Sequence, residues 1–589
     1  MTQLKVPKWL KSRYDLLWRD FQDKEFKTED IERVLKKENL DDMKGIAMMV
    51  SELKKAGWLI VELDPNDSRK RIYKFKNKDE ILEAAFKING TLNRTEIETI
   101  LKKAADLIRT RVDYKFILIL LFLKRISDKW ELEFDKAYKE AIADGLGEED
   151  AKKEAKNATY HDFAIPEKYL WENIRKDIAN LPENFSNALK VLSEKNPELK
   201  DILDNMDFIQ FTNNRENAEL LRQLVELFSE RKLHNVSADI LGDAYEWILR
   251  YFAPSKAKEG EVYTPREVIG LLVEMLDPQP GQSVYDPTCA SSGMLIVSYK
   301  HVQKQHGDEG AARLSLYGQE ANHKTLAFGK MNMYIHNIRN GNLAFGDTLL
   351  YPKFKEKDMV NQFDIVIANP PWNQDGYDEN VIKKAEFWSK RFPYGFVTKQ
   401  SADWAWIQHM VTSAKEGTGK VGVVIDNGCL FRGSKEKAIR EVVMEKKDLI
   451  ECVLLLPEKL FYNTGAPGAI IILNKNKPAD RKGKILFINA SQHFGQHPDV
   501  RKLNILTDEN IKDIATAYKE FKETPGFSKI IEIQDIRDND YNLNVSLYVF
   551  PEEETEEIDV HKEWEDLKKI TESISAVDDK IEGYLKELK

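Results

Sequence analysis

Short apolar runs alternate with amphipathic stretches between residues 260 and 476. The runs have the length of strands and carry few charges, as buried strands covered by helices on both faces require. Runs of this kind that alternate with helical patterns are typical of a doubly wound sheet. The expected fold class is therefore α/β, and the candidate strands are SVYD, SLYG, FDIVIA, KVGVVI, ECVLLL and AIIIL.

The pattern is different on either side of this region. Residues 90–250 are helical almost throughout and include Phe116–Leu123, an apolar run too short to cross a membrane, which predicts a buried helix. Residues 1–80 show three helical patterns and two strand-like runs, WLIVEL and IYKF, which resemble a winged helix. Such domains contact DNA or protein, and both roles stay open because Arg69–Arg71 also suit a solvated hairpin tip. The expected domains are a winged-helix-like extension (1–80), a helical domain (90–250), the sheet domain (251–480) and a C-terminal strand with a helical tail (481–589).

Composition limits the classes of function. The 589 residues are 42% hydrophobic and 32% charged, and the formal net charge is −10. A protein that holds duplex DNA alone is usually basic, so this charge argues against an independent DNA binder but allows a subunit that relies on a partner. Three scattered cysteines, Cys289, Cys429 and Cys452, offer neither a disulfide framework nor metal-ligand spacing. We therefore expect a cytoplasmic protein without a metal site, a membrane segment or a signal peptide.

Residues 363 to 372 read FDIVIANPPW, a buried-strand pattern that runs directly into Asn369-Pro370-Pro371-Trp372. Two consecutive prolines end the strand, because each lacks an N–H donor and has a fixed φ. The stiff loop that results follows the carboxyl end of the strand, where open α/β sheets bind ligands. An amide, a proline carbonyl and an aromatic face together suit a planar group with an exocyclic amine. An ordinary strand-ending turn is the alternative for these four residues taken alone.

A second polar loop follows the first strand of the domain, in VYDPTCASSGMLI. Small side chains let a ligand approach the backbone, and the helix expected from Met294 offers free N–H groups to a carboxylate. The loop lacks the phosphate-binding Gly-Lys-Ser/Thr and the three-glycine dinucleotide pattern, so a ligand with a carboxylate and an ammonium group fits better. A plain strand-turn-helix is the alternative. The candidate cofactor-binding residues are Asp286, Pro287, Thr288, Ala290, Ser291, Ser292 and Gly293.

Two acidic residues follow later strand-like runs. Glu320 ends LYGQE, at a position where an acidic residue accepts both hydroxyls of a ribose, and Asp347 in GDTL is suited to accept an adenine amine. Either residue alone would be uninformative, because acidic residues are common on surfaces. With Asn369 they form a series of polar residues at successive strand ends, which predicts one ligand track along the sheet edge.

An aromatic residue and a capping pair precede the first strand, in GEVYTPREVIGLLVEML. Thr264 is the expected N-cap of a helix and Pro265 its first residue. Capping explains these two residues without any ligand, but it does not explain Tyr263. We include Glu261, Tyr263, Thr264 and Pro265 among the cofactor-binding candidates.

In this order, the motifs resemble the amino-group DNA methyltransferases, specifically the modification subunits of type I restriction–modification systems. That family typically has a Tyr/Phe-Thr-Pro element, then DPACGSGGF, an acidic ribose ligand, Gly-Asp and Asn-Pro-Pro-Phe/Tyr. The resemblance covers residues 94 to 550, in segments such as DLIRTRVDYKFILILLFLKRISD, DNGCLFRGSKEKAIRE and LFYNTGAPGAIIILNKNK. The chain departs from the pattern at Ala290 and Ser292, where glycines are usual, and at Trp372, where Phe or Tyr is usual.

The resemblance implies a Rossmann-like methyltransferase sheet and S-adenosylmethionine as the cofactor. It implies that the loop from Asp286 to Gly293 holds the methionine part, Glu320 the ribose and Asp347 the adenine. The implied activity is that of a site-specific adenine DNA methyltransferase, which methylates N6 of an adenine.

The implied catalytic residues are Asn369, Pro370, Pro371 and Trp372. The target adenine must be flipped out of the duplex, because its amine is paired and stacked there. Asn369 and the carbonyl of Pro370 would then accept the two N–H bonds of the amine, and Trp372 would stack on the base.

Other functions share some of these motifs. Protein-glutamine methyltransferases also use Asn-Pro-Pro-aromatic, but they are much smaller and lack the helical N-terminal domain. A non-catalytic scaffold subunit is a second alternative, against which the intact Asn369, Glu320 and Asp347 argue. Cytosine-C5 methylation needs a cysteine after a proline, and no cysteine here follows one. A loose nuclease pattern, Pro498-Asp499 with Glu520–Lys522, falls partly in an expected helix, whereas the nuclease Glu-x-Lys belongs on a strand.

Residues 481–589 are too few for a large base-reading domain. The sequence therefore predicts a separate specificity subunit that recognises the duplex, and it leaves open a restriction subunit with nuclease and translocase activity. The closing helix is expected to pack on its partner or on the body of the chain. Its apolar positions at near-heptad spacing are Trp564, Leu567, Ile570, Ile574 and Val577.

Overall fold

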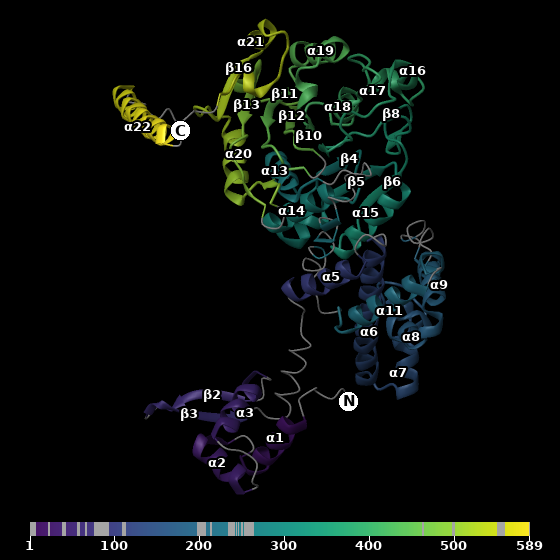
Figure 1. Cartoon of the computed structure of the whole chain (residues 1–589). Helices are drawn as coiled ribbons and strands as arrows, with labels where there is room; N and C mark the ends of the chain where they lie inside the picture. The colour runs from purple at the N-terminus through teal and green to yellow at the C-terminus, as the bar shows by residue number, and fades with distance from the viewer. Residues whose placement is uncertain are drawn as a thin grey trace. The chain divides into compact units, whose positions relative to one another are not determined.

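In the computed structural model, whose helices and strands are labelled in Figure 1, the chain forms two compact units. Unit 1 comprises residues 1–263 and 285–353, and unit 2 comprises residues 264–284 and 354–589. Glu261, Tyr263 and the Pro498-Asp499 pair lie outside the described residues. The structure describes residues 8–21, 24–37, 43–55, 59–64, 67–75, 94–108, 114–196, 199, 208–212, 215–233, 242, 244, 247–248, 251–252, 264–461, 464–497, 501–550 and 560–587.

The N-terminal part of unit 1 has the winged-helix-like arrangement that the sequence predicted. Three helices precede a long two-stranded ribbon, and the short strand β1 completes a sheet of order β1-β3-β2. Its core is aromatic: Phe75 packs against Phe26 at 4.8 Å and against Tyr14 at 5.1 Å between ring centroids. The elements are α1 (Lys8–Phe21), β1 (Glu25–Lys27), α2 (Thr28–Lys37), α3 (Met43–Lys55), β2 (Leu59–Asp64) and β3 (Asp67–Phe75).

The helical part of unit 1 is built around the long helix α6 (Lys115–Ala143). The apolar run Phe116–Leu123 lies in this helix, and its residues from Ile117 on are buried as predicted. No helix among the described residues is long and apolar enough to cross a membrane. The helices around α6 are α5 (Arg94–Ile108), α7 (Glu148–Ala155), α8 (Trp171–Lys176), α9 (Leu181–Lys195), α10 (Phe208–Phe211) and α11 (Arg215–Ser229).

A nine-stranded mixed sheet follows, with strand order β16-β13-β11-β12-β10-β9-β4-β5-β6. The strands β5 and β6 are parallel, as are β9 with β10 and β11 with β13, whereas β12 runs antiparallel to both of its neighbours. This confirms the α/β class. The strands are β4 (Ser283–Asp286), β5 (Ser315–Glu320), β6 (Gly341–Phe345), β9 (Ile365–Ala368), β10 (Lys420–Asp426), β11 (Ile450–Leu455), β12 (Gly468–Asn474), β13 (Lys484–Asn489) and β16 (Ser528–Glu532).

Helices of unit 1 and unit 2 flank these strands. In unit 1 they are α14 (Gly293–Ala312) and α15 (His323–Ile335), and in unit 2 the longer ones are α13 (Arg266–Leu276), α18 (Asp403–Thr412), α19 (Ser434–Glu441) and α20 (Asp508–Glu520). Short helices are α16 (Glu379–Ile382), α17 (Trp388–Arg391) and α21 (Ile533–Asp538), and two small hairpins pair β7 (Lys355–Glu356) with β8 (Met359–Val360) and β14 (Gly495–Gln496) with β15 (Asn504–Ile505). Helix α20 begins after its N-cap Thr507 and ends at Glu520. The Glu520–Lys522 part of the nuclease pattern therefore does not lie on a strand.

The last element, α22 (Val560–Glu587), is a long helix with an exposed apolar stripe. The five apolar positions that the sequence singled out are each more than half exposed, and Ile581 continues the stripe. The sequence left two expectations for this helix, packing on a partner or on the body of the chain. Among the described residues, the stripe does not pack on the body of the chain.

Candidate functional site

The loop that follows β4 in unit 1 is organised around a buried carboxylate. Asp286 ends the strand and is almost fully buried, and its Oδ1 accepts the backbone N–H of Thr288 at 2.9 Å. Burial raises the pKa of Asp286 to about 7, and the nearby carboxylate of Glu320 adds to the rise, while the N–H of Thr288 opposes it. Asp286 would favour a cationic ligand group, since a positive charge beside it would compensate for its burial.

Two residues of the loop have left-handed backbone. The φ angles are 44° at Ala290 and 65° at Ser292, the two positions where the resemblance expects glycines. Non-glycine residues pay about 1 kcal/mol or more for this conformation. Ala290 and Ser292 therefore adopt the backbone conformation that glycine favours, and the absence of glycine here costs backbone strain.

Helix α15 supports this loop from one side. Gly329 allows close approach, because a Cβ there would lie 2.7 Å from the carbonyl oxygen of Ala290. The side-chain amide of Asn332 donates to the carbonyl of Ser291 at 3.0 Å. Thr288 Oγ1, Ser292 Oγ and Asn332 Oδ1 are buried without a hydrogen-bond partner. Unsatisfied polar atoms are costly in a folded interior, so three of them around one loop point to a polar ligand.

Glu320 lies directly beside the loop. Its Oε2 accepts the backbone N–H of Ala290 at 3.1 Å, and its Oε1 accepts that of Asn322 at 2.7 Å. The buried side chain of the preceding residue, Gln319, donates to the carbonyl of Gly346 and so ties the end of β5 to the GDT segment. Local sequence offers no signal for Gln319, because its partners are more than 25 residues away.

The GDT segment is attached to the same loop. The hydroxyl of Thr348 donates to the carbonyl of Pro287 at 2.7 Å. Asp347 Oδ1 accepts the backbone N–H of Leu350 at 3.1 Å, which orients the carboxylate. Unit 1 thus brings together the predicted cofactor residues from Asp286 to Gly293, Glu320 and Asp347.

The Asn-Pro-Pro-Trp motif of unit 2, which we call the amine clamp, is held by two side-chain hydrogen bonds. Asn369 Nδ2 donates to Thr264 Oγ1 at 2.8 Å, and the indole Nε1 of Trp372 donates to Asn369 Oδ1 at 2.8 Å. The expected capping role of Thr264 is wrong: Pro265 occupies the N-cap position of α13, without a side-chain cap, and α13 begins at Arg266. The Thr264 hydroxyl instead orients the amide of Asn369.

Aromatic packing also restrains Trp372. Its ring lies edge-on to Phe461, with 4.8 Å between centroids and 67° between planes. Gly468 leaves room for this pair, because a Cβ there would lie 2.8 Å from Phe461 and 2.9 Å from Trp372. Phe461 is far from the motif along the chain, so the local sequence gives no sign of this contact.

A hydrogen-bond network that the sequence analysis missed fixes the residue after the clamp. Asn373 has a left-handed φ of 52°, and its backbone N–H donates to Asp403 at 3.0 Å. Its side-chain oxygen accepts from Arg432 at 2.7 Å. Arg432 also pairs with Asp403, Asp426 and Glu436. The guanidinium of Arg432 thus connects Asn373 to three acidic side chains. These lie in α18, at the end of β10 and in α19.

Among the described residues, no group of three or more His, Cys, Asp or Glu side chains is arranged to hold a metal ion. The three cysteines are buried and free, and burial raises the pKa of each thiol.

Known proteins with similar sequences identify the family. Residues 236–557 match the family described as N-6 DNA Methylase, and residues 97–228 match the HsdM N-terminal domain. The type I restriction enzyme MjaVIII methylase subunit of Methanocaldococcus jannaschii is 43% identical over 99% of this chain and 98% of its own length. The MjaVII methylase subunit of the same organism is 42% identical over 98% of this chain and 97% of its own.

A solved structure agrees in fold. The type I restriction-modification methyltransferase subunit from Streptococcus thermophilus has a TM-score of 0.67 at 24% identity, over 78% of this chain and all of its own. The chain therefore belongs to the N-6 DNA methylase family, among the methylase subunits of type I restriction enzymes.

Proposed function

We propose that this chain transfers a methyl group from S-adenosylmethionine to N6 of adenine in DNA, as the modification subunit of a type I restriction–modification complex. The observation that carries the proposal is the amine clamp, in which Thr264 and Trp372 fix the amide of Asn369. Membership in the N-6 DNA methylase family supports the choice of an adenine amine over other planar amines.

The loop of unit 1 fits S-adenosylmethionine. The ligand has an ammonium group for the buried Asp286, and its other polar groups suit the unpartnered Thr288 Oγ1 and Ser292 Oγ. Backbone N–H groups orient both carboxylates, of which Glu320 would accept from ribose hydroxyls and Asp347 from the adenine amine. When bound, this cofactor supplies an electrophilic methyl group on a sulfonium sulfur.

The clamp acts on the target base by positioning. The Oδ1 of Asn369 has a second lone pair beside the one that accepts from Trp372, and it accepts one N–H of the adenine amine. The carbonyl of Pro370 accepts the other N–H. Two such bonds favour a pyramidal nitrogen with its lone pair available for transfer, so no covalent nucleophile is required. As the new C–N bond forms, the bond between the methyl carbon and the sulfonium sulfur would break with its electron pair staying on the sulfur, and one amine proton would pass to water.

A separate specificity subunit selects the sequence and delivers the duplex. The net charge of −10 and the exposed apolar stripe of α22 support this division of roles, because the stripe offers a surface for another helical subunit. Deletion of residues 560–587 should abolish co-purification with the specificity subunit. Unchanged assembly of the truncated chain would remove α22 from the proposal.

The experiment that tests the function is transfer of a labelled methyl group to DNA that contains the recognised site. The chain with its specificity subunit should label the DNA, and the chain alone should label it far less. Asn369→Ala should abolish labelling, whereas Asn380→Ala, an exposed asparagine in α16, should retain it. Full activity of the isolated chain would contradict the role given to the partner.

A further inference from the structure

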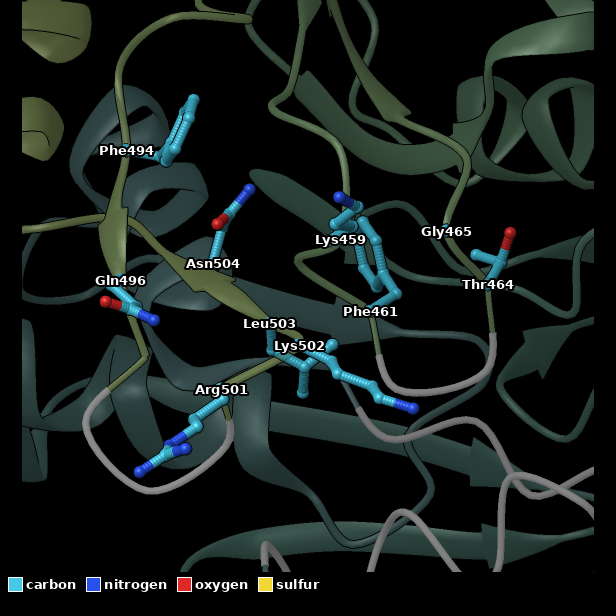
Figure 2. A pocket seen from close by; sticks show the side chains of 10 residues that line it. All are labelled: Lys459, Phe461, Thr464, Gly465, Phe494, Gln496, Arg501, Lys502, Leu503 and Asn504. Carbon is cyan, nitrogen blue, oxygen red and sulfur yellow. The ribbon is translucent and has the colours of Figure 1, made fainter. Parts of the chain in front are cut away.

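A basic pocket lies in unit 2, between the segment that carries Lys459 and Phe461 and the segment that carries Phe494 and Arg501 (Figure 2). Its volume is about 880 Å³. Three of its ten lining residues are cations, Lys459, Arg501 and Lys502, and none is acidic. In a chain with a net charge of −10, this is a local concentration of positive charge.

These three cations have no ion-pair partner among the described residues, in contrast to three basic residues that follow the far end of β12. Lys475 pairs with Glu416, Lys477 with Asp448 and Arg481 with Glu451. Uncompensated like charges around one pocket repel one another, and a polyanion would relieve that repulsion. The charge pattern therefore favours a ligand with more than one negative charge.

Backbone hydrogen bonds hold the two sides of the pocket together. The N–H of Asn504 donates to the carbonyl of Lys459 at 2.9 Å, and the side-chain amide of Asn504 donates to the carbonyl of Glu458 at 2.9 Å. Lys459 itself has a left-handed φ of 58°. The fold thus fixes the backbone that presents cations from two distant segments, as a preformed site requires.

A second pocket of about 570 Å³ adjoins the first and shares Lys459, Phe494 and Asn504 with it. Its other lining residues include the amides of Asn427, Gln492 and Asn544 and one acidic side chain, Glu458. The Oδ1 of Asn427 is buried without a hydrogen-bond partner. Side-chain amides suit the donor and acceptor groups of nucleobases. The two pockets together offer cations for phosphates and amides for bases.

We call the two adjoining pockets together the groove, and two aromatic residues also line it. Phe494, which lines both pockets, is 43% exposed and offers a face for stacking. Phe461 lines the basic pocket and contacts Trp372 of the amine clamp, with 4.8 Å between their ring centroids. The groove therefore begins next to the residues proposed to hold the target adenine.

We propose that this groove binds the DNA strand adjacent to the flipped adenine. Lys459, Arg501 and Lys502 contact its phosphates, Phe494 stacks on a neighbouring base, and Asn427 accepts a hydrogen bond from a base amine. This inference rests on the proposed function and extends it by naming side chains of this chain that hold the strand, in spite of the acidic net charge.

The test measures DNA binding by the complete complex as a function of salt. The variant K459A/R501A/K502A should lower the steepness of log affinity against log salt concentration by about 2 to 3, because each lost phosphate contact accounts for about 0.9. A control variant, K446A/K447A/K482A, removes the same charge at exposed positions of unit 2 and should leave the steepness unchanged. Affinity for S-adenosylmethionine and thermal unfolding should match the wild type in both variants.

A second variant tests the stacking contact without any change of charge. Phe494→Ala should raise the KM for DNA by about tenfold or more, in line with stacking effects on single bases, and Phe494→Tyr should restore it. An unchanged salt dependence in the triple variant would overturn the groove. A triple variant that assembles poorly with the specificity subunit, but binds DNA normally once assembled, would indicate an acidic protein segment as the occupant and would also overturn it.

The two proposals fail in different ways. If the wild-type complex binds DNA but transfers no methyl group, the proposed function fails, whatever the salt dependence of the variants. If the wild-type complex methylates DNA and the triple variant binds DNA with unchanged affinity and salt dependence, only the groove fails.

Discussion

The loop from Asp286 to Gly293 in unit 1 and the amine clamp in unit 2 are held in different ways. Side-chain hydrogen bonds restrain the clamp and the residue that follows it, through Thr264, Trp372 and Arg432. The loop has left-handed backbone at Ala290 and Ser292, and polar atoms around it lack partners. The Asn369 side chain is therefore oriented before any ligand arrives, whereas three buried polar atoms around the loop still lack hydrogen-bond partners. This difference is consistent with two roles: the clamp positions a reacting group, and the loop provides polar contacts to a bound ligand.

Loss of Arg432 should have the largest effect, because it removes the centre of the clamp's network. Arg432→Ala leaves the buried Asp403 without its cation, and the free energy of unfolding should fall by about 3 kcal/mol. Denaturant unfolding measures this change. Lys435→Ala, which removes only a surface pair with Glu379, is the control and should shift it by less than about 1 kcal/mol. Equal stability of the two variants would show that the network does not restrain the clamp.

The buried carboxylate of the loop should make cofactor binding depend on pH. Because an ammonium group needs ionised Asp286, affinity for S-adenosylmethionine should rise about tenfold per pH unit up to pH about 7 and then level off. Titration calorimetry between pH 5.5 and 8 measures this, and Asp286→Asn should bind weakly with little pH dependence. A flat profile for the wild type would remove Asp286 from the ammonium site.

The same raised pKa has a consequence for the cofactor-free protein. Folded Asp286 holds its proton at a pH where the unfolded carboxyl has lost it, so its contribution to the free energy of unfolding decreases as pH rises from about 4 to about 7. Bound cofactor should reduce this decrease.

The indole N–H of Trp372 should matter to the clamp but not to the loop. Trp372→Phe keeps an aromatic face and removes the donor to Asn369, so kcat should fall about tenfold, the equivalent of one hydrogen bond. The dissociation constant of S-adenosylmethionine should not change. Trp388→Phe, in α17, is the matched control and should leave kcat unchanged. An unaltered kcat in Trp372→Phe would mean that Asn369 is oriented by Thr264 alone.

The smallest expected effect concerns backbone strain in the loop. Ala290→Gly relieves the left-handed backbone but adds freedom to the unfolded chain, so the free energy of unfolding should rise by less than about 1 kcal/mol. Ala327→Gly, inside α15, should instead lower it by about 1 kcal/mol or more. Thermal unfolding compares the two variants. Equal destabilisation by both would indicate that the loop is not strained at Ala290.

Local patterns predicted much of the fold. Continuous apolar runs identified the buried strands β9 to β13, and all residues of β11 and β12 are buried. The strands β6 and β16 were missed because they lie at the two edges of the sheet, and their half-exposed sequences lack a continuous apolar run. Edge strands are short and partly polar, so their pattern resembles a loop.

The candidate site was predictable only in part. Asp286, Glu320, Asp347 and the clamp could be selected as candidates because polar residues at strand ends form a local signal. The contacts that orient them were not, because Arg432 lies 59 residues from Asn373 and Thr264 lies 105 residues from Asn369. A threonine before a proline gives the same local signal whether it caps a helix or holds another side chain.

Identification of the methylated atom tests the central claim most directly. The complex with its specificity subunit should transfer labelled methyl groups to DNA, and mass spectrometry of the digested DNA should find the label as N6-methyladenine. Asn369→Ala should lose at least about 100-fold of this activity, with unchanged affinity for S-adenosylmethionine, while Asn380→Ala should behave as the wild type. Label on cytosine or on protein, or full activity of Asn369→Ala, would contradict the account.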